Sequence, residues 1–256
     1  MQTIYLQGGL HGIPYGVYPR LFLIWLTTQA VRTKHPVISL GRSFREHCRA
    51  LGVPYIAGKR GTARTLQVQI ERLLQCRIIR EKITTPINLP ADISNPEKAI
   101  FEQTENLTLA SHTESLWRRS ENNDWTCNRY TLILSDEFLK ELINYAIPLR
   151  RSAIDALKRS PLATDIYQWL ASRFFTLTER AFPSWAQLAN QFGSDYKDAR
   201  KFRRKFIDAV ARVRAVYPEA NCEPTCDGLI LYPSDTPVAR IQNTGFSLHN
   251  AQKKTL

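Results

Sequence analysis

The chain has 256 residues, 43% of them hydrophobic, and its 35 Lys and Arg outnumber its 23 Asp and Glu to give a formal net charge of +12. This length suits one large or two small domains, and the charge favours a polyanionic partner, either nucleic acid or an anionic membrane surface. The longest apolar run, Leu21 to Leu26, is far below the roughly 20 residues of a membrane span. We therefore expect no membrane partner.

The cysteines and the N-terminus indicate a reduced, cytoplasmic protein. No signal-peptide pattern opens the chain, and five scattered cysteines argue against a full disulfide framework. Cys222 and Cys226 lack the second pair or nearby histidines that a tetrahedral zinc site needs. We expect neither a metal ion nor a cofactor.

The first half of the chain predicts three helices with short strands. Ile4 to Leu6 can form a strand, and Pro19 suits the first turn of a long apolar helix. Ser43 and Thr62 are the expected caps of the second and third helices, and Gly52 is expected to stop the second. The expected elements are a helix over 19–34, a strand over 37–40, a helix over 43–51 and a helix from 62 to about 75.

Strand patterns follow the third helix, where a winged helix has its wing. Cys76 to Ile83 alternates apolar and charged residues, and Arg77, Arg80 and Lys82 would line one edge. Residues 84–106 are predicted to be an insertion in the wing. Residues 107–117 and 129–134 are predicted as two further strands, joined by a polar turn.

The second half begins after a predicted junction helix over 135–149. Two apolar helices follow, over 150–159 and 162–175. Ser184 and Gln187 have the spacing of a capping box, Gly193 is expected to supply a positive φ, and Ser194 or Asp195 to cap the next helix. A hairpin is predicted over 222–232, and a mobile tail after Pro237.

The helix predicted over 196–216 has one apolar stripe and a basic face. The apolar stripe comprises Ala199, Phe202, Phe206, Ala209, Val210, Val213 and Val216. Its basic residues are Lys197, Arg200, Lys201, Arg203, Arg204, Lys205, Arg212 and Arg214. An ordinary solvated helix face is one interpretation. The short capped helix before it favours the other, a helix-turn-helix that binds DNA.

The order of elements is repeated, which predicts a mainly α fold with small β wings, that is, two tandem winged-helix domains. The expected boundaries are an N-terminal domain over 1–134, the junction over 135–149, a C-terminal domain over 150–236 and the tail over 237–256.

The stretch YPRLFLIWLTTQAVRT and the pair SWAQLANQFG and FRRKF closely resemble the RepA replication initiators of bacterial plasmids, within a resemblance that spans residues 12–233. The resemblance implies two winged-helix domains that bind repeated double-stranded origin DNA (iterons) and help to open it. It also implies recruitment of host replication proteins, namely the host initiator and the replicative helicase, and self-association into a dimer.

The resemblance places DNA contacts on the outward sides of two recognition helices. For base contacts these are Arg64, Thr65, Val68 and Arg72 in the first, and Lys197, Arg200, Lys201 and Arg204 in the second. The residues better placed for phosphates are Lys59, Arg60, Arg80, Lys82, Arg203 and Lys205. Arg118 lies outside this predicted surface, and its loss is expected to matter much less than the loss of Arg204.

Two alternatives remain open at this stage. A transcriptional repressor would use the same helices, and initiators of this family commonly repress their own promoter. A nuclease or relaxase is disfavoured because the five histidines are isolated and no phosphate-binding Gly-Lys-Ser/Thr loop is present. We expect the protein not to be an enzyme.

Overall fold

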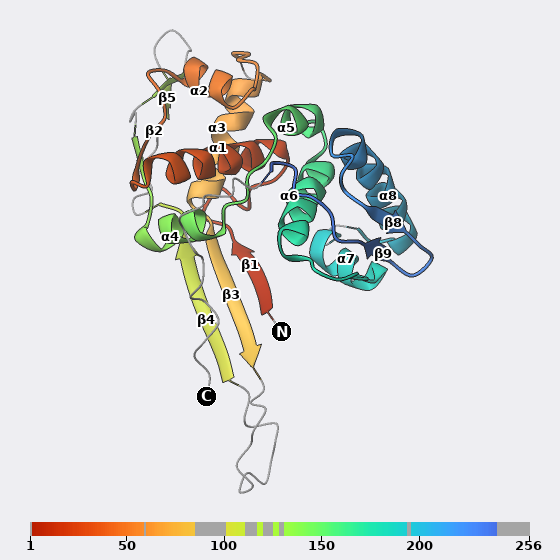
Figure 1. Ribbon diagram of the computed structural model, residues 1–256. Coiled ribbons are helices and arrows are strands. Elements are labelled where there is room, and N and C mark those ends of the chain that lie inside the picture. Colours follow the sequence, from red (N-terminus) through yellow and green to blue (C-terminus); the bar gives the residue numbers. More distant parts are fainter. Residues whose placement is uncertain are drawn as a thin grey trace, which may run out of the picture. The chain divides into compact units, whose positions relative to one another are not determined.

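Two units, Met1–Ala146 and Ile147–Leu256, make up the computed structural model of the chain (Figure 1). The structure describes residues 2–58, 60–84, 101–110, 117–119, 125–127, 131–193 and 196–239. The fold is α+β, and each unit is a winged helix. The tail predicted from 237 is described only as far as Ala239.

The first unit contains four helices and seven short to medium strands among its described residues. In chain order these are β1 (Gln2–Gln7), α1 (Val17–Thr33), β2 (Val37–Ser39), α2 (Phe44–Ala50), α3 (Thr62–Leu74), β3 (Arg77–Thr84), β4 (Phe101–Thr108), β5 (Trp117–Arg119), β6 (Trp125–Cys127), β7 (Thr131–Ile133) and α4 (Asp136–Tyr145).

The core of the first unit lies between α1, α2 and α3. Phe22 and Leu26 of α1, Phe44 of α2, and Leu66 and Ile70 of α3 are all fully buried. Residues three and four apart share a helix face, so the periodic apolar positions of each helix meet at one centre. Burying a side chain of this size contributes about 1.5–3 kcal/mol, so each of these five residues adds substantially to the stability of the unit.

The strands of the first unit pair in three separate antiparallel sheets. β3 lies between β1 and β4, β2 pairs with β7, and β5 pairs with β6. In the pairing of β2 with β7, Ile38 lies opposite Leu132, and both residues are buried. The two strands are separated by most of the sequence of the unit. This pairing places the segment between α1 and α2 beside the last strand of the domain.

Two strand predictions for this unit were wrong. Phe101 to Asn106, predicted as part of an insertion, forms most of β4, with Arg77 paired to Thr108 and Thr84 to Phe101. The polar stretch predicted as a turn contains β6, which pairs with β5. The remainder of the predicted insertion, 85–100, lies outside the described residues.

The helix predicted as a junction is part of the first unit. Ser135 caps α4 by accepting a hydrogen bond from the backbone N–H of Phe138, whose ring is buried. The helix packs on α1 and β4. The boundary between the units therefore falls after Ala146.

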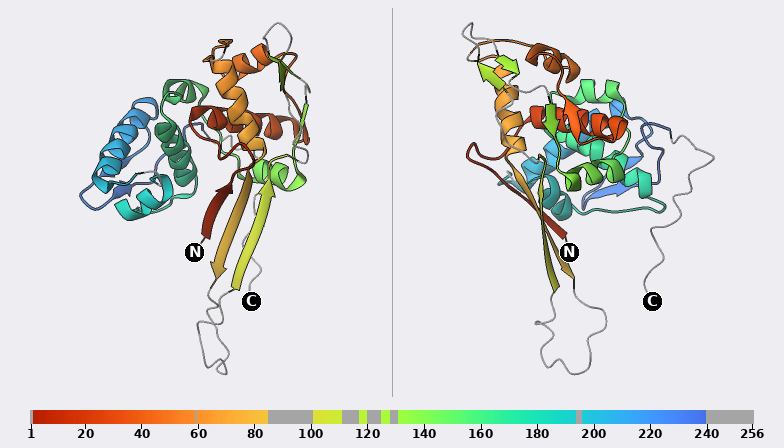
Figure 2. Two further views of the ribbon diagram at one scale, coloured as in Figure 1. Left: turned by 180° about the vertical axis from the view of Figure 1, so that it is seen from behind. Right: turned by 90° about the vertical axis from the view of Figure 1, so that its left-hand side faces the viewer.

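The second unit places three helices around α8 and closes with one hairpin. Its elements are α5 (Arg151–Leu157), α6 (Pro161–Thr176), α7 (Trp185–Phe192), α8 (Ala199–Val216), β8 (Cys222–Pro224) and β9 (Leu229–Leu231). Helix α8 contacts α5, α6 and α7 (Figure 2). The residues that it buries are Phe202, Phe206, Ala209, Val210 and Val213.

The segment before α7 extends the hairpin of the second unit. Ala181 pairs with Leu231 and Ser184 with Gly228 as isolated antiparallel bridges. A Cβ on Gly228 would lie 2.3 Å from the carbonyl oxygen of Pro183, so only glycine fits there. The segment between α6 and α7 thus pairs with β9, the last strand of the second unit. In the first unit, the segment between α1 and α2 pairs in the same way with β7, the last strand there.

Candidate nucleic-acid interface

Helix α3 presents the exposed side chains of its first turn to solvent. Arg64 and Thr65 are exposed, whereas Val68 is only partly so. The opposite face of the helix buries Ala63, Leu66 and Ile70. This is the arrangement of a recognition helix, whose N-terminal residues reach base edges in the major groove.

The turn before α3 is fixed by close backbone packing. A Cβ on Gly61 would lie 2.0 Å from the carbonyl oxygen of Ile56, so glycine is required. The prediction that Thr62 caps α3 was wrong, because Gly61 holds the cap position. The Thr62 hydroxyl instead donates to the carbonyl oxygen of Pro54 and accepts from the N–H of Ile56 at 3.2 Å.

Arg72, predicted to contact bases, is held by the N-terminal segment of the same unit. Its guanidinium lies 5.1 Å from the centre of the Tyr15 ring, and its Nε is buried. The backbone N–H of Tyr15 donates to Oε1 of Gln69 at 2.7 Å. The C-terminal half of α3 is therefore partly covered, and its N-terminal half is the accessible one.

Arg80 and Lys82 lie on the ribbon formed by β3 and β4, away from the start of α3. Figures 1 and 2 show the ribbon running onward from the C-terminal end of the helix and not back along it. Arg80 donates to Glu141 of α4 at 2.6 Å, and this hydrogen bond raises the pKa of the guanidinium. Only the backbone of Lys82 is described, and Lys59 lies outside the described residues.

Helix α8 begins three residues later than predicted. Asp198 is its cap, and the carboxylate accepts from the N–H groups of Arg200 at 2.8 Å and Lys201 at 3.4 Å. Lys197 is exposed but precedes the helix. Ser194 and Asp195, the predicted caps, lie outside the described residues.

The first two turns of α8 carry exposed cations. Arg200, Lys201, Arg204 and Lys205 are all exposed, while Phe202 and Phe206 point into the core. None of these four cations makes a side-chain hydrogen bond or ion pair within the described part of the chain. They are available to a ligand without loss of an internal contact.

Arg203, predicted to contact a phosphate, holds the hairpin of the second unit against α8. Its guanidinium donates to the carbonyl oxygen of Thr225 at 2.9 Å and lies 5.1 Å from the centre of the Trp185 ring. The indole N–H of Trp185 donates to the same carbonyl at 3.2 Å. The side chain therefore connects α7, α8 and the β8–β9 turn.

Aromatic packing sets the position of α8 against α7. The centre of the Phe206 ring lies 5.5 Å from the ring centre of Phe192, 5.5 Å from that of Phe202 and 5.9 Å from that of Trp185. The positive φ predicted for Gly193 was wrong, since its φ is −113°. Glycine is needed there because a Cβ would lie 2.8 Å from the carbonyl oxygen of Ala189 and 2.9 Å from the Phe202 ring.

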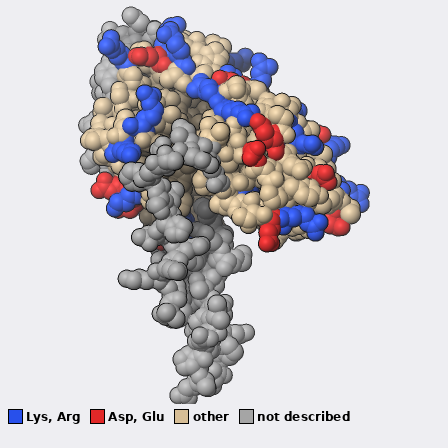
Figure 3. All heavy atoms as spheres, in the orientation of Figure 1, with Lys and Arg blue, Asp and Glu red and all other residues tan. Residues whose placement is uncertain are grey.

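Three exposed arginines near α2 were missed by sequence reasoning. Arg42, Arg45 and Arg49 surround a helix whose buried side is Phe44 and Cys48. Figure 3 shows Lys and Arg gathered over this end of the first unit and, separately, along the α8 side of the second. The spacing of four between Arg45 and Arg49, which places both on one helix face, is the signal that could have identified them.

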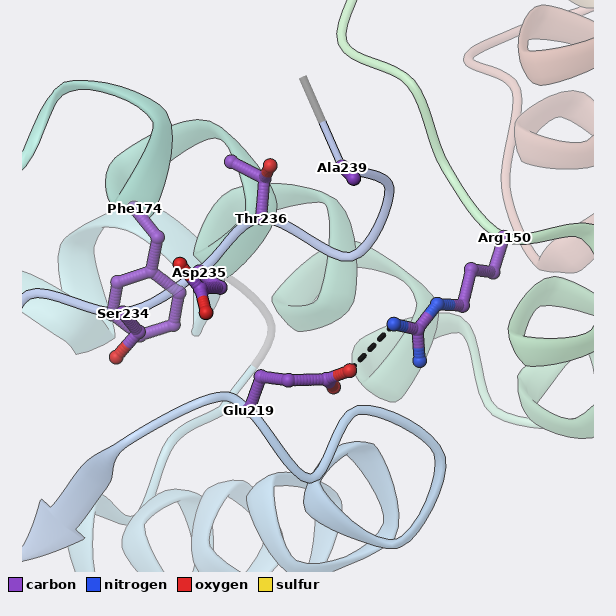
Figure 4. A pocket seen from close by; sticks show the side chains of 7 residues that line it. All are labelled: Arg150, Phe174, Glu219, Ser234, Asp235, Thr236 and Ala239. Atoms are coloured by element: carbon purple, nitrogen blue, oxygen red, sulfur yellow. Dashed lines mark hydrogen bonds and ion pairs between the residues drawn. The ribbon is translucent and has the colours of Figure 1, made fainter. Parts of the chain in front are cut away.

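A hollow in the second unit involves other elements. It is lined by Arg150, Phe174, Glu219, Ser234, Asp235, Thr236 and Ala239 (Figure 4). Arg150 donates to Glu219 at 2.5 Å, and this hydrogen bond lowers the pKa of the carboxyl group. Tyr217 donates its hydroxyl to the carbonyl oxygen of Asp235 at 2.5 Å, which holds the chain after β9 against the unit.

Among the residues that the structure describes, no group of three or more His, Cys, Asp or Glu side chains could hold a metal ion. None of the helices in that part of the chain has the length and apolar content that a bilayer crossing requires.

The comparisons with known proteins agree with the fold. Domains 2–3 of RctB match in two crystal structures, each with a TM-score of 0.52 and 12% sequence identity. The first match covers 90% of this chain and 86% of that one, the second 91% and 87%. No curated protein matches the sequence. The family described as "Plasmid encoded RepA protein" matches residues 13–187. The chain therefore belongs to the family of plasmid-encoded RepA proteins.

Proposed function

We propose that the protein initiates plasmid replication by binding repeated origin DNA through α3 and α8. The observation that carries the proposal is the same in both units: a winged helix in which one helix, α3 or α8, exposes cations in its first turns. Arg64 is exposed on α3, and Arg200 and Arg204 on α8. The family match gives this DNA-binding surface its biological setting.

The base contacts are assigned by chemistry and exposure. Arg200 and Arg204 suit bidentate bonds to guanine, as does Arg64, while Val68 can pack on a thymine methyl group. Arg60, Lys197, Lys201 and Lys205 suit phosphates, which set register without reading sequence. Arg72 and Arg203 keep a positioning role, because each already holds a neighbouring segment.

A single chain with two recognition helices predicts an unusual binding site. Successive major-groove faces are about 34 Å apart, roughly one turn of duplex. The two domains of one monomer should therefore cover a direct, non-palindromic repeat of around 20 base pairs. Opening of the origin and recruitment of the host initiator and helicase would follow binding, and the chain needs no catalytic residues or cofactor for this role.

Footprinting on the DNA upstream of the gene is the test. We expect protection of several direct repeats, each of around 20 base pairs. A single palindromic site, or equal affinity for random DNA, would contradict the proposal. Transformation with a plasmid that carries the candidate origin and this gene separates initiator from repressor, because a repressor gives no replication. Nicking of supercoiled origin DNA in Mg²⁺ would contradict a role without catalysis.

A further inference from the structure

Helix α8 carries an acidic side chain in the middle of its exposed basic face. Asp208 is exposed, and the other charged residues between Ala199 and Val216 are all Lys or Arg. Asp208 follows Arg204 by four residues and precedes Arg212 by four. Side chains at this spacing are neighbours on one face of a helix. The acid therefore lies within the surface that is proposed to meet DNA.

Asp208 lies on the side of α8 that faces away from the core of the second unit. The buried side of the helix includes Val213. At 3.6 residues per turn, Arg204 lies about 180° around the helix from Val213 and Asp208 about 140° from it, whereas Lys205 and Arg212 lie about 80° and 100° from it. A helix in the major groove turns the side opposite its own core towards the base edges. Asp208 is therefore placed beside Arg204 for base contacts, and Lys205 and Arg212 are placed at the flank for phosphates.

An ion pair within the helix is the ordinary role of an acid one turn away from an arginine. Helix α5 shows such pairs: Nε of Arg151 lies 3.1 Å from Oδ2 of Asp155, and Nζ of Lys158 lies 3.5 Å from Oδ1 of the same residue. Asp208 forms no ion pair with any residue in the described part of the chain, although cations lie one turn before and after it. Its carboxylate is therefore available to a donor outside the protein.

The major groove of DNA offers a carboxylate a restricted choice of partners. Phosphates repel it, and guanine and thymine present only acceptors among their polar groups there. Adenine presents the N7 acceptor beside its N6 amino group, which suits an amide that both donates and accepts. Cytosine presents only the donor N4 amino group, and this is the group from which acidic side chains accept. An acid on the base-facing side of α8 thus indicates a cytosine.

We propose that Asp208 reads a cytosine of the origin repeat by accepting a hydrogen bond from its N4 amino group. This inference rests on the proposed DNA-binding function and gives α8 a specificity-determining residue of the opposite charge to Arg204. Four residues of helix span about 6 Å, and successive base pairs are about 3.4 Å apart. The cytosine should therefore lie within about two base pairs of the guanine that Arg204 contacts.

Substitution of the origin repeat one base pair at a time tests the inference. The full chain would be titrated by fluorescence anisotropy against duplexes that each carry one changed base pair, with a scrambled duplex for comparison. The variants are Asp208→Ala and Asp208→Asn. The matched control is Asp155→Ala, which removes the same charge from another helix of the second unit.

For the wild type, replacement of the cytosine should weaken binding about 5- to 150-fold, as single mismatches typically do. Asp208→Ala should abolish this preference and keep the preference for the guanine that Arg204 contacts. Asp208→Asn should prefer adenine at the same position, because an amide donates to N7 and accepts from the N6 amino group. Asp155→Ala should keep the base preferences of the wild type.

The inference is overturned if Asp208→Ala keeps the wild-type preference at every base pair. It is also overturned if this variant changes the affinity for all duplexes by one common factor, which is the effect of removing a charge near phosphates. Both results leave the proposed function intact, whereas wild-type protein that binds the origin and scrambled duplexes alike contradicts that function as well. Circular dichroism checks folding, and if one Asp208 variant unfolds, loss or retention of the cytosine preference in the other decides.

Discussion

Replacement of Arg204 by Ala separates a contact with DNA from a contribution to folding. The side chain is exposed on the second turn of α8 and makes no hydrogen bond or ion pair with any described residue. Its removal should therefore change the free energy of unfolding by no more than about 0.5 kcal/mol, as for other surface positions without a partner. Loss of a bidentate contact to guanine should cost about 1–3 kcal/mol of specific binding.

That cost corresponds to an increase in Kd of about 5- to 150-fold on the origin repeat. Fluorescence anisotropy at fixed salt measures it, with a scrambled duplex for comparison. The matched control is Arg214→Ala, the same change at an exposed arginine near the C-terminal end of the same helix. If both variants lose equal affinity, or if Arg204→Ala weakens both duplexes alike, the assignment of Arg204 to base readout is refuted.

Three further changes test the packing and charges of the second unit. Asp198→Ala removes the cap of α8 and should cost about 1 kcal/mol, a drop in Tm of about 4–8 °C, whereas Asp208→Ala, an exposed acid on the same helix, should change Tm little. Phe206→Ala empties a site enclosed by aromatic rings and should cost about 3–5 kcal/mol in urea denaturation; a loss below 1 kcal/mol would contradict the packing. Because Arg150 lowers the folded-state pKa of Glu219, the ion pair stabilises the protein fully above the usual value of 4.5 and less as pH falls through the folded pKa, so the stability difference between wild type and Glu219→Gln should shrink on acidification. A difference that stays constant from neutral pH to pH 3 would count against this ion pair.

Local signals were read correctly from the sequence because they act over a few residues. Ser184 accepts from the N–H of Gln187, and the Gln187 side chain accepts from the N–H of Ser184, as the capping box predicted. Five of the seven residues predicted for the apolar stripe of α8 are buried, whereas Ala199 and Val216, at the two ends of the helix, are exposed and partly exposed. Gly52 has a φ of 69° and ends α2 as expected.

Features that depend on distant contacts were not predictable in the same way. Leu132 pairs with Ile38 across more than ninety positions, and no local pattern specifies which strands meet. At position 193 a Cβ would lie 2.8 Å from the Ala189 carbonyl oxygen and 2.9 Å from the Phe202 ring, so glycine is needed because of its neighbours in the fold and not because of a positive φ. Arg203 is as basic as Arg204 in the sequence, yet only the fold shows that it holds the carbonyl of Thr225.

Hydroxyl-radical footprints of Arg64→Ala and Arg204→Ala on one origin repeat test the central claim most directly. The account predicts that the wild type protects two clusters about one helical turn apart on the same face of the duplex. Arg64→Ala should weaken protection in one cluster and Arg204→Ala in the other. If both changes erase the same cluster, or if each leaves a symmetric footprint of two identical half-sites, then one chain does not place α3 and α8 on the same DNA.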